Sequence, residues 1–413
     1  MKDLAQFIHK IIESNPKEVD LTSDLHSELI IETVESILEQ VSSIKDIETI
    51  ESQLIEKNDP SLIFILLALK IVRSKLLASE VKKTIHVSVV FAVYKEHNRI
   101  LKSSEHPHGE DFLLKKVRQL EWLFSDTPQI SWELMVVDDG CPEGSGKIAE
   151  EIIKENDLGE QVRVLFLEEA IAKGYAPAKQ LNSTNESQKG GSIVYGMWDA
   201  VRRHGKEDHV VVYTDADLST HLGQLMLLID PIQHKNKAVA IGSRREKESV
   251  VIKKGARNDR GKLFIYLWKR LIPNLGHVVD TQCGFKAFEA RMVSEIIDNL
   301  IEKKFAFDIE LLLRSELVKK GSVIKVPIAW IDSEAASTTT DLQPYLPMLK
   351  AIVKMNRRYF PDEARRNYFA DFIAQLDPEA FDILLENIPQ AIVSREPAEF
   401  ADFDGVRVSD LTT

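Results

Sequence analysis

Five short apolar runs, each rich in β-branched residues, recur between residues 86 and 241. A parallel strand that is buried on both faces gives this pattern, because neither face needs polar side chains. Helical patterns lie between most of the runs, at 111–124, 143–156 and 191–204. The alternation predicts an α/β fold with a mainly parallel sheet flanked by helices. The expected strands are 86–93, 132–137, 162–167, 210–214 and 238–241.

The chain outside this α/β region has a different pattern. Residues 1–80 carry apolar stripes at helical spacing, the last over about 61–77, and residues 361–413 hold twelve acids and four bases. A chain of 413 residues has room for two or three domains. We therefore expect a helical N-terminal domain at 1–82, the α/β domain at 83–358, and an acidic helical C-terminal extension at 359–413.

Composition limits the setting of the protein. The two cysteines, Cys141 and Cys283, allow no disulfide framework or zinc-ligand spacing, which favours a reducing, cytoplasmic setting. A net charge of −12 argues against general nucleic-acid binding. Met1–Leu4 begins no signal-peptide pattern, and the longest apolar run, 62–69, is far shorter than the ~20 residues of a spanning helix. Any membrane contact is therefore expected to be peripheral.

Two aspartates, Asp215 and Asp217, follow the run 210–214 directly. Ligands bind in α/β folds where parallel strands end, and paired carboxylates there can hold a hard divalent cation together with substrate phosphates. The pair therefore predicts a metal-assisted site for a nucleotide diphosphate. The alternative is an ordinary strand-to-loop turn, in which aspartate is common.

Two further motifs fall where strands end or helices begin. Asp138-Asp139-Gly140 ends the run 132–137, so its carboxylates can accept hydrogen bonds from a base or a ribose; the alternative is a turn or helix cap. Lys189-Gly190-Gly191 precedes a helix, and glycines there let the backbone approach a phosphate. Gly-Gly before a helix is a weak signal when taken alone.

Two later motifs carry charged side chains as well. The segment 280–288 places Asp280, an amide and Lys286 around a glycine turn. Asp308 and Glu310 lead an apolar helix, where the helix dipole alone favours acids.

The segment 244–270 is strongly basic, with ten bases and three acids. It is a candidate anion site, and its alternative is a solvated surface. Within it, Lys253, Lys254, Arg257 and Arg260 precede the apolar run 263–268. Bases beside aromatic and apolar residues suit an anionic lipid head and its chain.

In this order the motifs resemble family 2 glycosyltransferases with the GT-A fold, a Rossmann-like α/β architecture, over about residues 86–358. The matching segments are 86–93 with Tyr94-Lys95-Glu96, Asp138-Asp139-Gly140, Lys189-Gly190, 215–220, Gly242-Ser243-Arg244, 280–286 and 307–311. Within that family, 281–286 and 330–334 most resemble dolichyl-phosphate and polyprenyl-phosphate glucosyltransferases.

The resemblance implies a role for each matching residue. The base and the ribose would contact Glu96 and one or both of Asp138 and Asp139. The rest of the nucleotide sugar would contact Lys189, Asp215, Arg244 and Lys286. Asp217, with Asp215, would bind Mg²⁺ or Mn²⁺, which neutralises the leaving diphosphate. The catalytic positions would be Asp308 and Asp280, with Asp308 at the place of the general base in hydroxyl-transferring relatives.

The acceptor stays open at this point. A polyprenyl phosphate is one expectation, and a soluble acceptor is another, because no membrane segment is found. A non-catalytic sugar-nucleotide sensor or scaffold is a third alternative. A nucleotidyltransferase is disfavoured, because 93–97 lacks a Gly-rich, Arg-containing turn. The expected partners are a nucleotide-diphosphate sugar and a lipid-phosphate or soluble acceptor, but not nucleic acid; peripheral membrane contact and homo-oligomerisation stay open.

Overall fold

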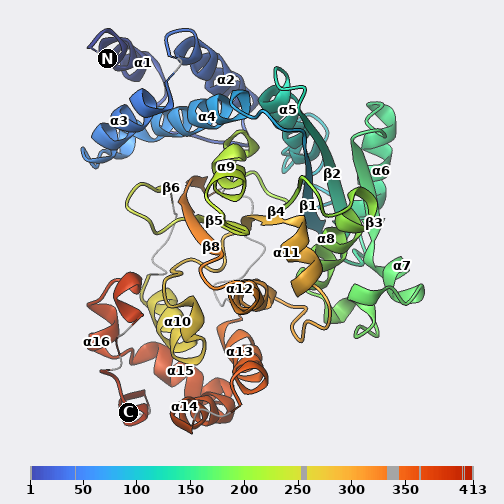
Figure 1. The fold of residues 1–413 in the computed structure, drawn as a ribbon, viewed down its shortest axis with the longest axis vertical. Helices are drawn as coiled ribbons and strands as arrows, with labels where there is room; N and C mark the ends of the chain where they lie inside the picture. The colour runs from blue at the N-terminus through green and yellow to red at the C-terminus, as the bar shows by residue number, and fades with distance from the viewer. Residues whose placement is uncertain are drawn as a thin grey trace.

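The computed structural model describes residues 2–41, 43–252, 258–332, 344–361, 364–401, 403 and 405–411. Its centre is a seven-stranded sheet in the order β3-β2-β1-β4-β7-β5-β8, and β6 and β9 form a separate parallel pair (Figure 1). Every pairing in the large sheet is parallel except those of β7. The strands are β1 Ile85–Val93, β2 Ile130–Asp138, β3 Val162–Phe166, β4 His209–Thr214, β5 Val239–Ser243, β6 Val250–Ile252, β7 Phe285–Glu289, β8 Val323–Pro327 and β9 Ala329–Ile331.

The predicted α/β class is confirmed, and all five expected strands form within two residues of their expected ends. Strands β6 to β9 were not expected. Strand β7 overlaps the end of the motif that we interpreted as a glycine turn, and it runs antiparallel between β4 and β5. Its five residues include a lysine, so local apolar periodicity gives no strand signal there.

Helices cover both faces of the sheet. Alternate strand residues such as Val89 and Val212 share an apolar cluster with α4, α5 and α9, whereas Val90 and Val211 share another with α8 and α10 to α13. The helices between strands are α5 Phe112–Phe124, α6 Ser145–Glu155, α7 Leu167–Ala172, α8 Gly190–His204, α9 Met226–His234, α10 Asn258–Leu271, α11 Ala290–Ile296 and α12 Phe307–Val318. Two apolar layers therefore enclose the sheet, as its near-continuous apolar strands require.

Four helices precede the sheet: α1 Lys2–Ser14, α2 Asp24–Leu38, α3 Ile44–Ile55 and α4 Ile63–Ser79. The sequence indicated three, and α3 was not expected. Helix α4 is buried on almost every side, because it packs against α2 and α3 and also against α9 on the sheet. Its Lys70 side chain is fully buried and donates to Glu51 Oε1 of α3 at 2.6 Å. The N-terminal helices thus share one apolar cluster with a face of the sheet.

After β9 the chain forms α13 Tyr345–Tyr359, α14 Ala364–Gln375, α15 Pro378–Glu386 and α16 Gln390–Val393. These helices pack around α10 at the other end of the molecule from α1 to α4 (Figure 1). The run 263–268 belongs to α10 and is buried along its whole length. Our interpretation of this run as a membrane-contacting surface is therefore wrong. Among the described residues, no helix is both long and apolar enough to cross a membrane.

Candidate active site at the carboxyl edge of the sheet

The two central aspartates lie where β4 leaves the sheet. The Asp215 carboxylate contacts the Lys189 ammonium, and their side chains keep 32% and 31% exposure, so a ligand can reach both. Gly284, just before β7, passes beneath this carboxylate: a Cβ there would lie 2.3 Å from both Asp215 oxygens. Antiparallel pairing of Thr214 with Phe285 produces this close approach. Only glycine fits at position 284 without moving Asp215.

The two carboxylates differ in their electrostatic surroundings. Burial by itself would raise the pKa of Asp215, but the Lys189 ammonium outweighs it and holds that pKa below its ordinary value. Burial, and then the Asp215 charge, raise the pKa of Asp217. Asp217 Oδ1 accepts the Ser219 N–H at 3.0 Å, and within the described ranges its other oxygen has no hydrogen bond. The charges of Lys116 and Arg99 offset the effects of burial and of Asp215 only in part, so the Asp217 carboxylate is less fully compensated than that of Asp215.

Lys189 is held in a strained backbone conformation, with φ 87° and ψ −50°, immediately before α8. Its N–H donates to Asp139 Oδ2 at 2.7 Å, and Ser192 Oγ donates to Asp139 Oδ1 at 2.6 Å. Asp139 thus fixes the turn that aims Lys189 at Asp215. The first glycine of the motif has a packing role, because a Cβ on Gly190 would lie 2.6 Å from the Lys303 carbonyl oxygen.

A buried lysine–aspartate pair lies close to this contact. Lys286 Nζ, on β7, donates to Asp308 Oδ1 at 2.8 Å and to the Cys283 carbonyl. Burial lowers the pKa of Lys286 to about 8 and raises the pKa of Asp308 well above its ordinary value, although the Lys189 charge opposes the second shift. Both shifts favour the neutral forms of the two side chains.

Asp280 and Arg244 form a separate bidentate pair. Arg244 donates through Nε and Nη2 to the two Asp280 oxygens at 2.8 Å each, and its backbone N–H donates to Oδ2 at 2.9 Å. Burial would raise the pKa of Asp280, but the guanidinium holds it well below its ordinary range. The guanidinium carbon lies 5.1 Å from the centre of the Trp330 ring. In this geometry Asp280 orients Arg244.

The remaining predicted acids have protein partners. Both Asp138 oxygens accept backbone N–H groups, at 2.9 Å from Gly140, 2.8 Å from Cys141 and 2.7 Å from Gly146. The alternative interpretation, a turn and helix cap, accounts for these bonds.

Glu96 lies in a chain of charges beside Asp217. It accepts from Arg99 Nη1 at 2.8 Å, and Arg99 also binds Glu110 through two nitrogens. Burial, opposed by Arg99 and reinforced by Asp217, raises the pKa of Glu96. Glu310 accepts the Ile301 and Glu302 N–H groups, which makes its contacts structural.

Lys116 of α5 is a site residue that the sequence did not indicate. Its fully buried ammonium donates to the Asp217 carbonyl oxygen at 2.7 Å, and burial lowers its pKa to about 8 despite the nearby Asp217 and Asp215 charges. A Lys-Lys pair in a helix usually indicates a solvated face, so nothing in the local pattern marked it.

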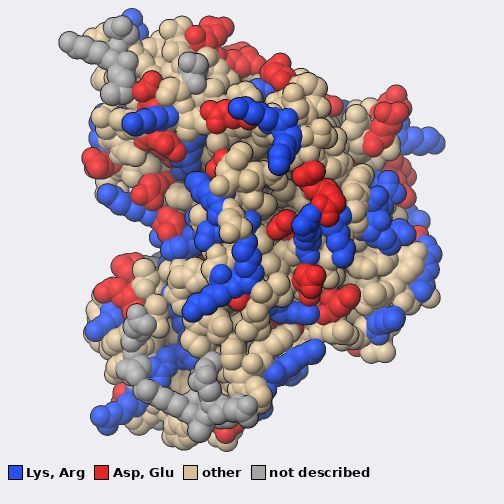
Figure 2. Space-filling view, viewed as in Figure 1, with Lys and Arg blue, Asp and Glu red and all other residues tan. Residues whose placement is uncertain are grey.

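The basic segment 244–270 has mixed roles. Lys262 and Lys269 bind carbonyl oxygens of the C-terminal region, those of Val393 and Pro397. Lys253, Lys254 and Arg257 lie outside the described residues. Figure 2 shows Lys and Arg gathered along the middle of one face, between the N-terminal and the C-terminal helices. This positive stripe belongs to a chain whose net charge is −12.

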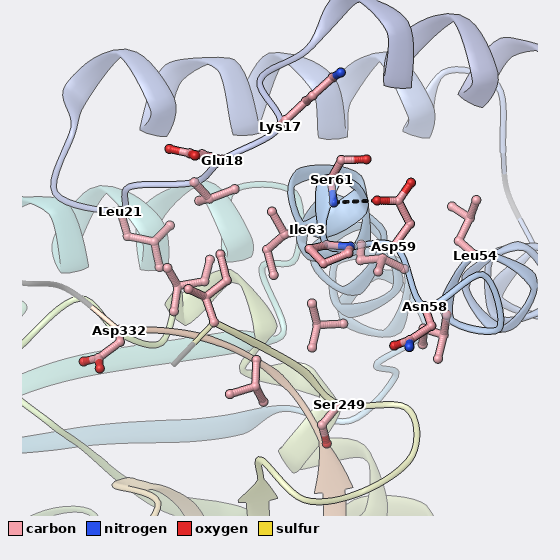
Figure 3. Close-up of a pocket in the computed structure, with 18 of the residues that line it drawn as sticks. Lys17, Glu18, Leu21, Leu54, Asn58, Asp59, Ser61, Ile63, Ser249 and Asp332 are labelled. Carbon is pink, nitrogen blue, oxygen red and sulfur yellow. Dashed lines mark hydrogen bonds between the residues drawn. The ribbon is translucent and has the colours of Figure 1, made fainter. Parts of the chain in front are cut away.

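A cavity of about 1360 Å³ is lined by residues of the N-terminal helices and of β6 and β9, which also pack against α4. Leu21 and Ile63 face its interior, and Asp332 lies at one side (Figure 3). The backbone of Ile331, which also lines it, donates to the Ser219 carbonyl at 2.9 Å. The cavity wall is thereby joined to the loop that carries Asp217.

Comparison with known proteins gives distant relatives. No family model matches the chain. Dolichyl-phosphate beta-glucosyltransferase of Saccharomyces cerevisiae is 24% identical over 243 residues, which cover 55% of this chain and 65% of that protein. The Drosophila melanogaster protein of the same name is 25% identical over 264 residues, which cover 62% of this chain and 70% of that protein. Glycosyltransferase AglD of Haloferax volcanii is 24% identical over 247 residues, which cover 60% of this chain and 33% of that protein.

Solved structures with a similar fold include two synthases. Mannosyl-3-phosphoglycerate synthase from Rubrobacter xylanophilus has a TM-score of 0.48 at 16% identity, covering 71% of this chain and 79% of that chain. Glucosyl-3-phosphoglycerate synthase from Mycobacterium tuberculosis has a TM-score of 0.45 at 14% identity, covering 69% and 84%. The chain is a distant homologue of the dolichyl-phosphate beta-glucosyltransferases, as its ordered motifs predicted, and of AglD.

Proposed function

We propose that the chain is a metal-dependent, inverting glycosyltransferase that moves a hexose from a nucleotide-diphosphate sugar to an acceptor. The observation that carries this proposal is the exposed Asp215–Lys189 contact beside Asp217, at the edge of the sheet where α/β folds bind ligands. A cation next to paired carboxylates suits a diphosphate, because the phosphates need positive charge from both protein and metal. The sugar and the base are left open.

Mg²⁺ or Mn²⁺ fits the donor set at this edge. Asp217 has a carboxylate oxygen without a hydrogen bond among the described residues, and its pKa is raised by burial and by Asp215. A divalent cation is the partner that would stabilise its charged form. Asp217 would hold the ion with help from Asp215, and when bound the ion would neutralise the leaving diphosphate.

The residues around the pair have separate proposed tasks. Lys189 would move from Asp215 towards the diphosphate, since both groups are accessible and the turn is fixed by Asp139. Asp138 would act through the loop whose backbone it holds, which would contact base and ribose together with Glu96. Arg244, oriented by Asp280, would face the sugar or its phosphate.

For the acceptor we propose a polyprenyl phosphate, because the distant relatives are named dolichyl-phosphate glucosyltransferases. A phosphate acceptor is anionic near neutral pH and can attack the anomeric carbon without a general base. The cavity between the N-terminal helices and β6 would offer apolar wall to the prenyl chain through residues such as Leu21 and Ile63.

A hydroxyl acceptor is the second candidate, favoured by one observation. Asp308 is buried and hydrogen-bonded to Lys286, and its pKa is raised, which makes its carboxylate a stronger base. Asp308→Asn separates the two candidates. With a phosphate acceptor we expect turnover within about tenfold of the wild type, and with a hydroxyl acceptor a loss of about 10²–10⁴-fold.

The donor half of the proposal is tested by transfer and hydrolysis assays with a panel of nucleotide sugars, with Mn²⁺ and after chelation. We expect turnover with one donor, its loss on chelation, and its loss in Asp217→Asn. Asp230→Asn, an acid on α9 that pairs with His234, is the matched control and should keep activity. Donor binding without any turnover in the presence of acceptors would instead indicate a sensor.

A further inference from the structure

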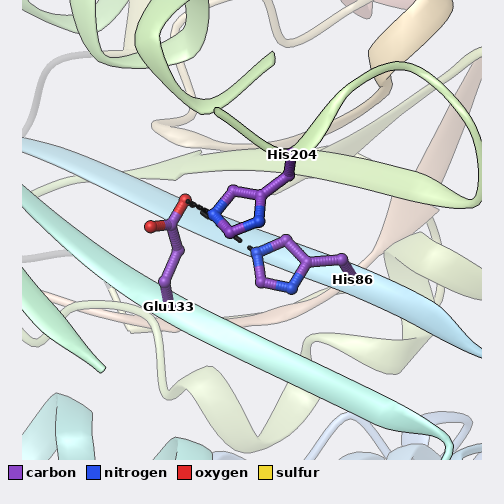
Figure 4. Close-up of side chains that lie close together, drawn as sticks. All are labelled: His86, Glu133 and His204. Atoms are coloured by element: carbon purple, nitrogen blue, oxygen red, sulfur yellow. Dashed lines mark ion pairs between the residues drawn. The ribbon is translucent and has the colours of Figure 1, made fainter. Parts of the chain in front are cut away.

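Two histidines and a glutamate meet at the amino edge of the sheet, at the end opposite the candidate active site. His86 lies at the start of β1, Glu133 lies on β2, and His204 is the last residue of α8 (Figure 4). Helix α8 begins beside Lys189 and has 15 residues, so this cluster lies about 22 Å along the helix from the catalytic edge.

The three side chains already have the spacing of metal ligands. Glu133 Oε1 lies 3.1 Å from His204 Nε2 and 3.9 Å from His86 Nε2, and all three atoms lie within 4.8 Å of one another. Tetrahedral zinc with bonds of about 2.0–2.1 Å places its ligand atoms about 3.4 Å apart. In Figure 4 both dashed lines run to the same carboxylate group. The His86 and His204 rings are stacked, with their centres 3.8 Å apart and their planes at 24°, so one ring must rotate before both nitrogens can bind the same ion.

His86 supplies a second, independent observation. Its Nε2 is buried and has no hydrogen-bond partner among the described residues, although it faces the cluster. Buried polar atoms are normally satisfied, so an orphaned imidazole nitrogen needs an explanation. On the other side of the ring, Nδ1 lies 2.8 Å from Ser131 Oγ. A proton on Nδ1, donated to that hydroxyl, leaves the Nε2 lone pair free for a metal.

Hydrogen bonds from residues around the cluster also hold the Glu133 carboxylate in place. Ser88 Oγ donates to Glu133 Oε1 at 2.6 Å, and Arg163 Nε donates to Oε2 at 3.1 Å. His209 Nε2 lies 3.0 Å from the same Ser88 hydroxyl. Metal ligands in proteins are characteristically oriented by such a second layer of hydrogen bonds.

We propose that His86, Glu133 and His204 bind a divalent transition-metal ion, with Zn²⁺ the best match and water completing the coordination. Imidazole and carboxylate together suit zinc, whereas the aspartate pair at the other edge offers only oxygen and suits Mg²⁺ or Mn²⁺. The His204 side chain is 30% exposed, so ion and water can enter from solvent. The bound ion would fasten the end of α8 to β1 and β2. This site is independent of the proposed glycosyl transfer.

The test uses the full chain carrying Asp217→Asn, so that the oxygen site does not compete. After chelation and dialysis, Zn²⁺ is titrated by calorimetry and Co²⁺ by visible absorption. We expect one equivalent of Zn²⁺ to bind with micromolar or tighter affinity, a tetrahedral Co²⁺ spectrum, and a raised melting temperature. Adding His204→Gln, a change at a partly exposed residue, should weaken Zn²⁺ binding at least tenfold and remove the Co²⁺ bands.

His234→Gln is the matched control, because His234 is an exposed helical histidine paired with a single acid, Asp230, at 2.9 Å. It should leave Zn²⁺ binding unchanged. Circular dichroism verifies that each variant is folded. No one-to-one binding at micromolar Zn²⁺, or equal affinity with and without His204→Gln, would overturn the proposal and leave the cluster as a histidine–glutamate ion-pair network.

Discussion

At the scale of single residues, the site depends on charged side chains, buried or half-buried, whose partners come from distant parts of the sequence. Asp215 is held by Lys189 and Asp308 by Lys286, and these contacts join four segments of the chain. The sequence identified Lys189, Asp215 and Asp308 because each follows a strand or opens a helix, and Lys286 because it belongs to the motif at 280–288. It missed Lys116, because a buried lysine in a helix differs from a solvated one only in what the tertiary fold brings against it.

Lys303, a buried lysine in the loop before α12, gives a pH prediction. Burial lowers its pKa to about 8, whereas an unfolded lysine titrates at about 10.4. Between these values the unfolded chain binds more protons, so the Lys303 contribution to the free energy of unfolding rises with pH. We expect Lys303→Met to be more stable than the wild type at pH 7, by about 1–3 kcal/mol, and this advantage to shrink by pH 10.

Urea unfolding of both proteins between pH 7 and pH 10 measures this difference. Lys304→Met changes an exposed neighbour and should leave the pH dependence of stability as it is in the wild type. A constant gap between Lys303→Met and the wild type over this range would contradict the predicted titration.

At the scale of elements, the strands that follow long apolar runs were predictable and the short ones were not. Strands β1 and β2 have nine residues each and need no neighbour to be recognised. Strand β7 has five, and its identity comes from pairing with β4 and β5, which lie 40 or more positions away in the chain. For the same reason the burial of α10 could not be predicted from its own sequence, because residues beyond 344 cover it.

The glycine that precedes β7 gives the second prediction. Gly284→Ala would place a methyl group 2.3 Å from the Asp215 oxygens, so the carboxylate must turn away from Lys189. We expect nucleotide-sugar turnover to fall at least tenfold, while the melting temperature changes much less. Gly159→Ala is the matched control, because a Cβ there meets nothing within 4 Å. Full activity in Gly284→Ala would show that the Asp215 position is not critical.

At the scale of the whole molecule, the N-terminal helices and the sheet share one apolar cluster through α4. We expect a boundary near residue 82 because the hydrophobic pattern changes there from helical to strand-like. Such a change indicates the type of secondary structure, but it does not show whether the two parts share a core. The separate-domain interpretation stays a prediction, and it can be tested because all five tryptophans lie after residue 82. Trp122 of α5 donates to Glu35 Oε1 of α2 at 3.1 Å and so also senses the N-terminal helices. In a Trp122→Phe background, fluorescence of the other four tryptophans reports on the sheet and the helices that flank it.

Leu67 of α4 is fully buried, whereas Leu25 of α2 is 63% exposed. If the cluster unfolds as one unit, Leu67→Ala should lower the unfolding free energy by about 2–5 kcal/mol in both fluorescence and circular dichroism. Leu25→Ala should change it by less than about 0.5 kcal/mol. A Leu67→Ala transition that shifts in circular dichroism but not in fluorescence would instead support an autonomous domain.

The reversed strand β7 has a consequence for the order in which the protein is built. Strands β3, β2, β1 and β4 form one block and β5 with β8 another, and β7 alone bridges them. On a growing chain, Asp215 and Asp217 are therefore synthesised well before β7, the strand that joins β4 to β5. Insertion of β7 then brings Gly284 beneath Asp215 in the same step that joins the two blocks. The placement of Gly284 beneath Asp215 and the joining of β4 to β5 are thus one structural event, and β8 then adds only the outer edge of the sheet.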